Sequence, residues 1–355
     1  MNVNIDTKYY KLDPLKPDQE IIDACGLLLR SGGLVGFPTE TVYGLGANAL
    51  DGDACRRIFA AKGRPQDNPL IVHVSSLNEV EYLTSALPAQ AKRCMAAFWP
   101  GPLTLVLPRS EQVPDVVTAG LNTVAIRMPD HPVALALIQA AGVPVAAPSA
   151  NLSGRPSPTR GEHVLEDLEG RIEAVLDAGP CRVGIESTVL DLTEASPVIL
   201  RPGGITREEL EEVLGQVVYD PALRNSELTP RSPGVKYLHY APKGKVILVE
   251  GSAEKVRARI KLELQQGRAR GLKVAVLCSE ESEAAYRPEN PDYLAVLGSR
   301  QHPGRAAASL YHALRECDQH EIGLILAETF EQTGLGTAVM NRLDKAAGNC
   351  RIVEN

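Results

Sequence analysis

In the first two thirds of the chain, segments whose hydrophobic positions follow the helical period alternate with segments that are typical of strands. The helical period predicts helices at residues 18–30, 53–62, two segments before Trp99, 133–141 and 162–168. Gly32 and Gly33 follow the first helix, and Gly63 ends the second. Short apolar runs predict strands at 34–37, 70–74, 103–107, 123–128, 143–147, 174–177, 188–192 and 198–201. This order predicts a large domain with a mixed α/β sheet.

A break in this pattern predicts a domain boundary. Thr206 and Glu209 form a capping-box signature that opens a helix to Leu214. Residues 219–242 then hold four prolines without periodicity, which favours a linker or a long functional loop. From 245 onward short strands alternate with helices, as in a small parallel sheet with flanking helices. We expect a first domain at 1–215, a linker at 216–243 and a second domain at 244–355.

Composition narrows the class of protein. A chain of 355 residues is too long for one ordinary domain, and 44% hydrophobic but only 4% aromatic residues suit buried parallel strands. The net charge of −7 argues against a protein that mainly coats nucleic acid. Seven scattered cysteines form no CxxC pair, so we expect free thiols, no zinc site and a cytoplasmic location. We expect no signal peptide and no membrane association, because no suitable apolar run is present.

Two loops of the first domain carry polar groups that suit a small ligand. Residues 37–46 (FPTETVYGLG) combine hydroxyls, a carboxylate and glycines, although a plain strand-to-helix turn would look similar. Lys62 and Arg64 flank Gly63, a pattern that suits a polyphosphate clamp. The helix dipole alone would also explain Lys62.

Two cationic or titratable residues lie within predicted strands. His73 shares a strand face with Ile71, where a hydrogen-bonded core histidine is more common than a catalyst. Arg127 lies opposite the apolar face of residues 123–128 and needs an anionic partner. A substrate carboxylate or a structural acid would serve.

Three other segments contain residues that could contact a ligand. Ser149 and Asn151 follow an apolar strand at the edge where α/β sheets bind ligands, although a polar turn is equally consistent. The segment 232–242 is too rich in Lys, His and Tyr for a passive spacer, although a linker packed on the first domain by its tyrosines is the alternative. Gly334 and Gly336 form only a faint nucleotide-like pattern, and the chain lacks Walker A, HExxH and Gly-x-Ser-x-Gly motifs.

Taken together, the segments PTETVYGLG, KGRP, NPLIVH, PSANLSG, ESTVLD, RPG and SPGVKYLHYAP resemble the threonylcarbamoyl-AMP synthase family in its two-domain form. The resemblance implies a YrdC-like catalytic domain with a mixed twisted sheet, a linker that contributes to the active site, and a smaller Rossmann-like parallel α/β domain. It is specific through about residue 205 and in the linker, and only general after 243.

The resemblance also implies roles for individual residues. The family's Lys-x-Arg and Ser-x-Asn pairs, taken as catalytic, correspond to Lys62, Arg64, Ser149 and Asn151. L-Threonine would be held by Thr41, His73, Arg127 and Ser187, with Arg127 on the carboxylate. ATP would be held by Arg64, Asn68, Thr123, Ala147, Ser149, Ser157, Arg201 and Tyr240.

The implied reaction joins L-threonine, bicarbonate or CO2, and ATP to give threonylcarbamoyl-AMP and pyrophosphate, with Mg²⁺ accompanying ATP. A downstream threonylcarbamoyl transferase complex would use the product to modify tRNA, and weak tRNA binding stays open. One alternative is a YrdC-like module that binds RNA without catalysis, which the acidic balance disfavours. Another is a carbamoyl transferase of the hydrogenase-maturation type, but the chain lacks that class's paired cysteines and acylphosphatase-like domain.

Overall fold

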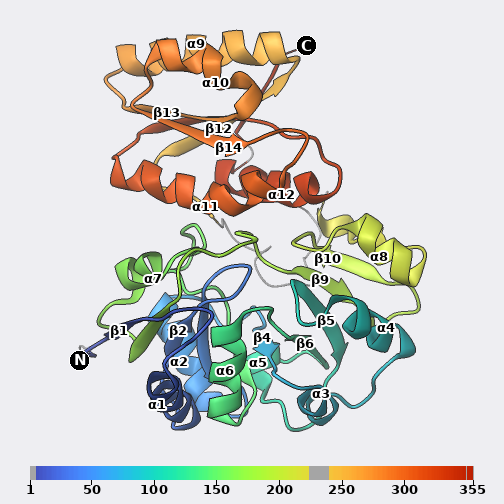
Figure 1. The fold of residues 1–355 in the computed structure, drawn as a ribbon. Helices are drawn as coiled ribbons and strands as arrows, with labels where there is room; N and C mark the ends of the chain where they lie inside the picture. The colour runs from blue at the N-terminus through green and yellow to red at the C-terminus, as the bar shows by residue number, and fades with distance from the viewer. Residues whose placement is uncertain (1–4, 224–239, 349, 355) are drawn as a thin grey trace. The chain divides into compact units, whose positions relative to one another are not determined.

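A computed structural model describes residues 5–223, 240–348 and 350–354. The chain divides into two compact units (Figure 1). The described residues up to Ser153 and those from Ser157 to 223 form the first unit. The second unit contains Gly154–Pro156 and the described residues from Tyr240 onward. Residues 224–239, the greater part of the predicted linker, lie outside the described residues.

The first unit is built on a mixed sheet, as the sequence predicts. Among the described residues it has 11 strands in the order β1-β8-β2-β3-β7-β4-β6-β5-β9-β10-β11. The strands are β1 Lys8–Lys11, β2 Val35–Phe37, β3 Gly44–Asn48, β4 Ile71–His73, β5 Leu103–Pro108, β6 Thr123–Arg127, β7 Val145–Ala146, β8 Ala174–Asp177, β9 Thr188–Asp191, β10 Val198–Arg201 and β11 Val218–Tyr219. Because β11 pairs with β10, the start of the predicted linker is an edge strand of this sheet.

The helices of the first unit begin and end where local signals predict. Asp18 caps α1 with its carboxylate, Gly63 ends α2 in the left-handed region at φ 62°, and Thr206 and Glu209 form the capping box of α8. These helices are α1 Gln19–Arg30, α2 Gly52–Lys62, α3 Leu77–Leu83, α4 Ala89–Phe98, α5 Asp115–Thr118, α6 Pro132–Ala141, α7 Gly161–Leu168 and α8 Arg207–Leu214. A short 3-10 turn, Pro221–Leu223, closes this part of the chain.

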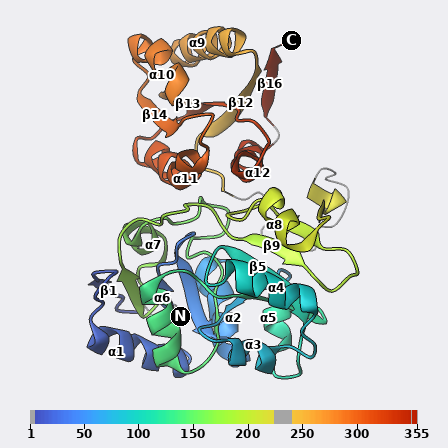
Figure 2. The same ribbon diagram turned by 45° about the vertical axis from the view of Figure 1, so that its right-hand side comes forward.

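The second unit is a five-stranded, fully parallel sheet in the order β14-β13-β15-β12-β16. Helices α9 and α10 cover one face and α11 and α12 the other, a three-layer arrangement visible in both Figure 1 and Figure 2. The elements are β12 Lys245–Gly251, α9 Ala253–Ala269, β13 Val274–Ser279, α10 Glu280–Tyr286, β14 Tyr293–Gly298, α11 Gly304–Gln319, β15 Leu324–Glu328, α12 Leu335–Ala347 and β16 Arg351–Glu354. This confirms the prediction of a small parallel α/β domain.

One structural interpretation from the sequence is wrong. The segment after β2 is not a strand-to-helix turn, because Gly44–Asn48 forms β3 and pairs with β2 as an antiparallel hairpin. The residues of β3 are too small to produce a strand signal, but they have to be small here. A Cβ on Gly46 would lie 2.9 Å from Val145 Cγ1 and 3.0 Å from Phe37 Cε1.

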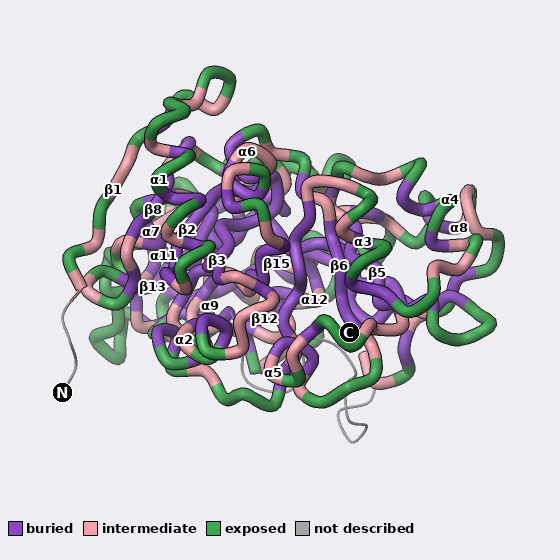
Figure 3. The backbone as a smooth tube through the Cα atoms, turned by 90° about the horizontal axis from the view of Figure 1, so that it is seen from below, coloured by how far each residue is buried: buried purple, intermediate pink, exposed green. Residues whose placement is uncertain are grey.

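Strand register gives the first sheet two different faces. One face contributes Val72, Leu105, Ile126 and Leu190 to the main core. The other carries a smaller apolar cluster of Ile71, Val106, Ala125, Val189 and Leu200. Buried backbone follows the central strands in Figure 3, whereas exposed positions concentrate on the outer turns of helices and on loops. Three residues predicted to bind substrates lie on the face of the smaller cluster, namely His73, Arg127 and Arg201.

Candidate active site

A row of polar side chains crosses the sheet face that carries the smaller apolar cluster. His73 is the register partner of Arg127 in the parallel pair β4–β6. Thr104 pairs with Val189, and Val189 pairs with Arg201 on the next strand. Since Val106 pairs with Ala125, alternation also places Thr104 on the face of Arg127. The sheet therefore presents His73, Arg127, Thr104 and Arg201 on one face.

Arg127 is buried and makes contacts with three residues. Its Nη1 donates to Thr41 Oγ1 at 2.8 Å and its Nε to the Gly101 carbonyl at 3.2 Å. Its Nη2 lies 2.5 Å from Glu40 Oε2, and both side chains are at most 4% exposed. The strand pattern predicts an anionic partner for Arg127, and in this structure that partner is Glu40, an acid of the protein itself. Thr41 and Arg127, both predicted to bind threonine, are in direct contact.

His73 is held as a neutral imidazole. Burial, with a further contribution from the charge on Arg127, lowers its pKa to about 3. Its ring packs edge-on against Phe37 with centroids 6.1 Å apart. Its Nδ1 is buried without a hydrogen bond. A neutral imidazole with a free ring nitrogen suits hydrogen bonding to a substrate better than charge pairing.

Ser187 and Arg201 lie together at the far end of the polar row. Arg201 donates to the Ser187 carbonyl from Nε at 3.1 Å and from Nη2 at 2.9 Å, and Nη2 lies 3.2 Å from Ser187 Oγ. The Ser187 and Thr104 hydroxyls are 2.7 Å apart. The structure therefore brings together one residue predicted to bind threonine and one predicted to bind ATP.

The Lys-x-Arg and Ser-x-Asn segments meet where α2 ends. Lys62 is only 3% exposed. Its Nζ donates to the carbonyls of Ser149 and Asn151, the latter at 2.5 Å. Ser149 Oγ in turn donates to Asn151 Oδ1 at 2.6 Å. Three of the four residues predicted as catalytic thus form one hydrogen-bonded cluster.

Arg64 leaves this cluster because the left-handed Gly63 turns the chain. Its guanidinium donates to the carbonyls of Asn68 and Pro69 at 3.1 and 3.3 Å and lies over the Phe59 ring. These bonds pre-position a cation on the loop that leads into β4. Asn68, predicted to bind ATP, is in contact with Arg64 through its backbone.

Three other residues predicted to bind ATP occupy defined positions in the first unit. Thr123 begins β6, and the Ala147 amide donates to the Ile71 carbonyl at 2.8 Å. Ser157 is fully buried and donates to Glu186 Oε1 at 2.6 Å. Its hydroxyl hydrogen is therefore already engaged with a protein carboxylate.

Tyr240 is described only within the second unit. Its ring lies 5.2 Å from that of Tyr311, with the cationic ends of Arg342 and Lys345 5.7 and 5.9 Å from its centroid. The backbone of Tyr240 has φ 65°, unusual for a residue other than glycine.

Three polar residues of this region were not singled out by sequence reasoning. Glu40 pairs with Arg127, Thr104 meets Ser187, and Glu186 accepts from Ser157. The requirement for an anion near Arg127 is the signal that could have led to Glu40. Nothing comparable marks Thr104 or Glu186, because their partners lie 83 and 29 residues away in sequence.

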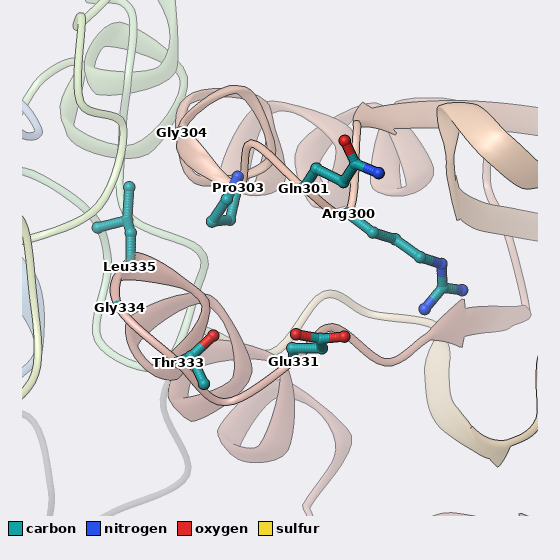
Figure 4. A pocket seen from close by; sticks show the side chains of 8 residues that line it. All are labelled: Arg300, Gln301, Pro303, Gly304, Glu331, Thr333, Gly334 and Leu335. Atoms are coloured by element: carbon teal, nitrogen blue, oxygen red, sulfur yellow. The ribbon is translucent and has the colours of Figure 1, made fainter.

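The second unit has a pocket of ≈ 400 Å³ between the loops that follow β14 and β15 (Figure 4). It is lined by Arg300, Gln301, Pro303, Gly304, Glu331, Thr333, Gly334 and Leu335. The guanidinium of Arg300 is already held by Glu328, Ser279 and the Thr329 carbonyl. The pocket contains Gly334 of the faint nucleotide-like pattern, but its one cation is committed to the protein itself.

Neither a metal cage nor a membrane span is found in the part of the chain that the structure describes. No three His, Cys, Asp or Glu side chains there are grouped so as to hold a metal ion. No described helix combines the length and apolar character needed to cross a bilayer.

Sequence families match both parts of the chain. Residues 27–203 match the Sua5_yciO_yrdC family, described as "Telomere recombination". Residues 205–348 match the family described as "Threonylcarbamoyl-AMP synthase, C-terminal domain".

Curated relatives align with nearly the whole chain. The chain is 51% identical over 337 residues to the threonylcarbamoyl-AMP synthase of Bacillus subtilis (strain 168), covering 95% of each chain. It is 38% identical over 369 residues to the Schizosaccharomyces pombe protein of the same name, covering 95% of this chain and 90% of the relative. The crystal structure of P. abyssi Sua5 complexed with L-threonine superposes with a TM-score of 0.93 at 48% identity, over 98% of this chain and 100% of that one.

Proposed function

Because the chain belongs to the threonylcarbamoyl-AMP synthase family, we propose that it condenses L-threonine, bicarbonate or CO2, and ATP to threonylcarbamoyl-AMP and pyrophosphate. The observation that carries the proposal is the 51% identity to such a synthase over 95% of both chains. The geometry supports it through a buried guanidinium, a neutral imidazole and hydroxyls gathered on one sheet face.

The threonine end of the site is proposed at the carboxyl ends of β4 and β6. There Arg127 would take the substrate carboxylate through charge-assisted hydrogen bonds. Thr41, already bonded to Arg127, and neutral His73 would take uncharged polar groups of the amino acid. Ser187 would complete this end from beside β9, where its hydroxyl adjoins Thr104.

The ATP end is proposed toward the opposite end of the same strands. Thr123 begins β6 and Arg127 ends it, so the two Cα atoms lie about 13 Å apart along the strand. Ala147 is level with Ile71, two residues before His73. Arg64 and Asn68 come from the loop before β4, and Ser149 follows β7. The remaining proposed ATP residues are Ser157, Arg201 and Tyr240. Of these, Arg201 contacts Ser187 and therefore lies at the threonine end, where the two substrates would meet.

The chemistry requires positioning and neutralisation of charge more than a protein nucleophile. The threonine ammonium first loses one proton. The neutral amine then forms a bond to the carbon of bicarbonate, and the hydroxyl of bicarbonate leaves as water with one hydrogen of the amine. The new carbamate oxygen then attacks the α-phosphate, and the bond to the leaving pyrophosphate breaks. Lys62 and Arg64 would neutralise charge on the phosphates, and the Lys62 contacts to Ser149 and Asn151 fix where that charge lies.

Mg²⁺ is proposed to enter with ATP. This ion usually keeps several waters and binds through substrate phosphates with one or two carboxylates, so it does not require a cage of protein ligands. The absence of such a cage among the described residues is compatible with that mode. The ion would add positive charge where pyrophosphate departs.

The product is proposed to pass to a downstream transferase that modifies tRNA. An acyl adenylate is prone to hydrolysis, so the transferase has to receive it before water does. We propose a cytoplasmic location, which is supported by seven free cysteines, six of them buried. We also propose weak direct contact with tRNA. The net charge of −7 gives this part of the proposal the least support.

The test is pyrophosphate release from ATP by the purified chain with Mg²⁺. Release should require both L-threonine and bicarbonate and should fail when serine replaces threonine. No release in any combination, together with RNA binding in a mobility shift, would replace the synthase by a non-catalytic RNA-binding module.

A further inference from the structure

Four buried polar atoms near the proposed threonine end lack hydrogen bonds. They are Glu40 Oε1, Glu40 Oε2, Arg127 Nη2 and His73 Nδ1. Glu40 and Arg127 are at ion-pair distance, 2.5 Å, but the contact does not have hydrogen-bond geometry. Buried polar groups in folded proteins almost always find hydrogen-bond partners, so this cluster requires an explanation.

For Glu40 and Arg127 the fold itself does not supply the missing partners. Glu40 is 2% exposed, Arg127 4% and His73 4%, so bulk water does not solvate them. The other two nitrogens of Arg127 already donate to Thr41 and Gly101. The guanidinium is therefore held in place by the protein, while the carboxylate opposite it has acceptor capacity to spare.

The unsatisfied groups are complementary to an amino-acid zwitterion. A carboxylate offers four lone-pair sites to an ammonium, and a guanidinium nitrogen offers a donor to a carboxylate. In the Glu40–Arg127 ion pair, the guanidinium occupies the place that the ligand ammonium would take beside Glu40. The Glu40 carboxylate likewise occupies the place that the ligand carboxylate would take beside Arg127. An α-amino acid carries both charges a few bonds apart, so each member of the pair would change partner on binding.

We propose that Glu40 binds the α-ammonium of L-threonine, as the counterpart of Arg127 on the carboxylate. The inference deepens the proposed function, on which it rests. It adds a residue that contacts the substrate and selects ligands that carry an α-ammonium. It also puts the nitrogen that will attack carbon beside a fixed acceptor, which orients its lone pair once the proton has left.

The groups that act on Glu40 electrostatically come from three parts of the first unit. Besides Arg127 they include His131 and Cys181. Burial lowers the pKa of His131, so this histidine does not supply a second cation at neutral pH. Burial, followed by the charge of Glu40, raises the pKa of Cys181, so its thiol stays neutral. A ligand ammonium would therefore add a positive charge beside Glu40 that neither His131 nor Cys181 supplies.

The experiment compares ligands that lack one charge of threonine. (R)-3-Hydroxybutyrate lacks the ammonium, and threoninol lacks the carboxylate. Dissociation constants for these two and for L-threonine are measured with the wild-type chain, Glu40→Gln and Arg127→Gln. Glu40→Gln should weaken L-threonine and threoninol about 10-fold to 100-fold and change 3-hydroxybutyrate little. Arg127→Gln should show the reverse selectivity for the two analogues.

A structural role would give a different result. If Glu40 only positioned Arg127, Glu40→Gln would weaken L-threonine and 3-hydroxybutyrate equally, and the proposal would be overturned. Unchanged L-threonine affinity would overturn it as well. Glu40→Asp, which keeps the charge, should recover part of the lost affinity if Glu40→Gln folds poorly. Glu111→Gln, an exposed acid, is the matched control.

Failure of the proposed function can be told apart from failure of this inference. Pyrophosphate release by the wild-type chain tests the reaction, whereas the affinities test the ammonium contact without any turnover. Wild-type chain that binds threonine but releases no pyrophosphate would reject the reaction alone.

Discussion

His73 and Arg127 are register partners in β4 and β6, so a buried imidazole and a buried guanidinium lie side by side on one sheet face. Their proximity adds to burial in holding the imidazole neutral. The same pairing that fixes the backbone thereby contributes, after burial, to the neutral state of a residue at the proposed threonine end.

The first prediction concerns pH and stability. The pKa of His73 is about 3 in the fold and 6.5 when unfolded, so between these values only the unfolded chain binds this proton. The contribution of His73 to stability is therefore complete above pH 6.5. It falls by about 1.4 kcal/mol per pH unit as the pH drops toward 3. His73→Asn should remove this slope.

Trp99 provides the measurement, because it is the chain's one tryptophan and lies in the first unit. Its fluorescence would follow denaturant unfolding at pH 5 and pH 7 for wild type and His73→Asn. His131, whose pKa is also lowered, keeps its own slope in both proteins. His302→Asn, an exposed residue of the second unit, is the control. Equal slopes for His73→Asn and wild type would contradict the assignment.

Arg127→Ala should raise the KM for threonine far more than the KM for ATP. Loss of a charge-assisted contact to the carboxylate predicts an increase of about 10-fold to 100-fold. Initial rates of pyrophosphate release at varied substrate concentrations provide the check, with Arg182→Ala as an exposed arginine control. Equal increases for both substrates would mean that Arg127 supports the site as a whole.

Lys62→Met should destabilise the first unit as well as slow the reaction. The substitution leaves the carbonyls of Ser149 and Asn151 without the ammonium that they accept from, at a cost of about 2 to 4 kcal/mol. The free energy of unfolding from Trp99 fluorescence measures this, and Lys92→Met on the exposed side of α4 should change little. Full stability with lost activity would assign Lys62 to the phosphates alone.

Gly203→Ala should distort the segment that carries Ser187. A Cβ at this position would lie 2.3 Å from the Thr188 amide nitrogen and 2.4 Å from the Glu186 carbonyl oxygen. These backbone atoms cannot move away without distorting the chain. We therefore expect the free energy of unfolding to fall by about 2 to 4 kcal/mol and the KM for threonine to rise. Gly52→Ala meets only ordinary contacts and is the control. Normal stability of Gly203→Ala would show that the backbone can shift.

Tyr240→Ala should weaken nucleotide binding if the residue serves the ATP site. Loss of its ring from the proposed nucleotide site predicts a rise of about 2-fold to 10-fold in the KM for ATP. Tyr293→Ala, which removes a different aromatic contact of the second unit, provides the comparison. An unchanged KM for ATP would leave Tyr240 a purely structural residue of that unit.

Local signals in the sequence account for most of the fold. Caps such as Asp18 and Thr206 act within one turn, so helix starts can be predicted from neighbouring residues alone. Strands β1 and β16 were not predicted, because they are four-residue strands without fully buried positions. The short helices α5 and α10 were not predicted either, although Ser279 followed by Glu280 and Glu281 is a helix-start signal.

The site was harder to predict than the fold, because its contacts are long-range. Arg127 and Thr41 are 86 residues apart, and Lys62 and Asn151 are 89 residues apart. A single sequence shows that Arg127 needs an anion but not which acid supplies it. The alternation in residues 123–128 did predict the face on which Arg127 lies, and the register confirms that placement.

The strand β6 also limits how this protein can change in evolution. Thr123 and Arg127 are joined by regular backbone, so inserting one residue between them would turn one of the two to the opposite face. Inserting two would restore the face but separate the two proposed substrate ends by about 7 Å more. Insertions and deletions should therefore accumulate in the surface loops, while this strand keeps a constant length for as long as both substrates must meet.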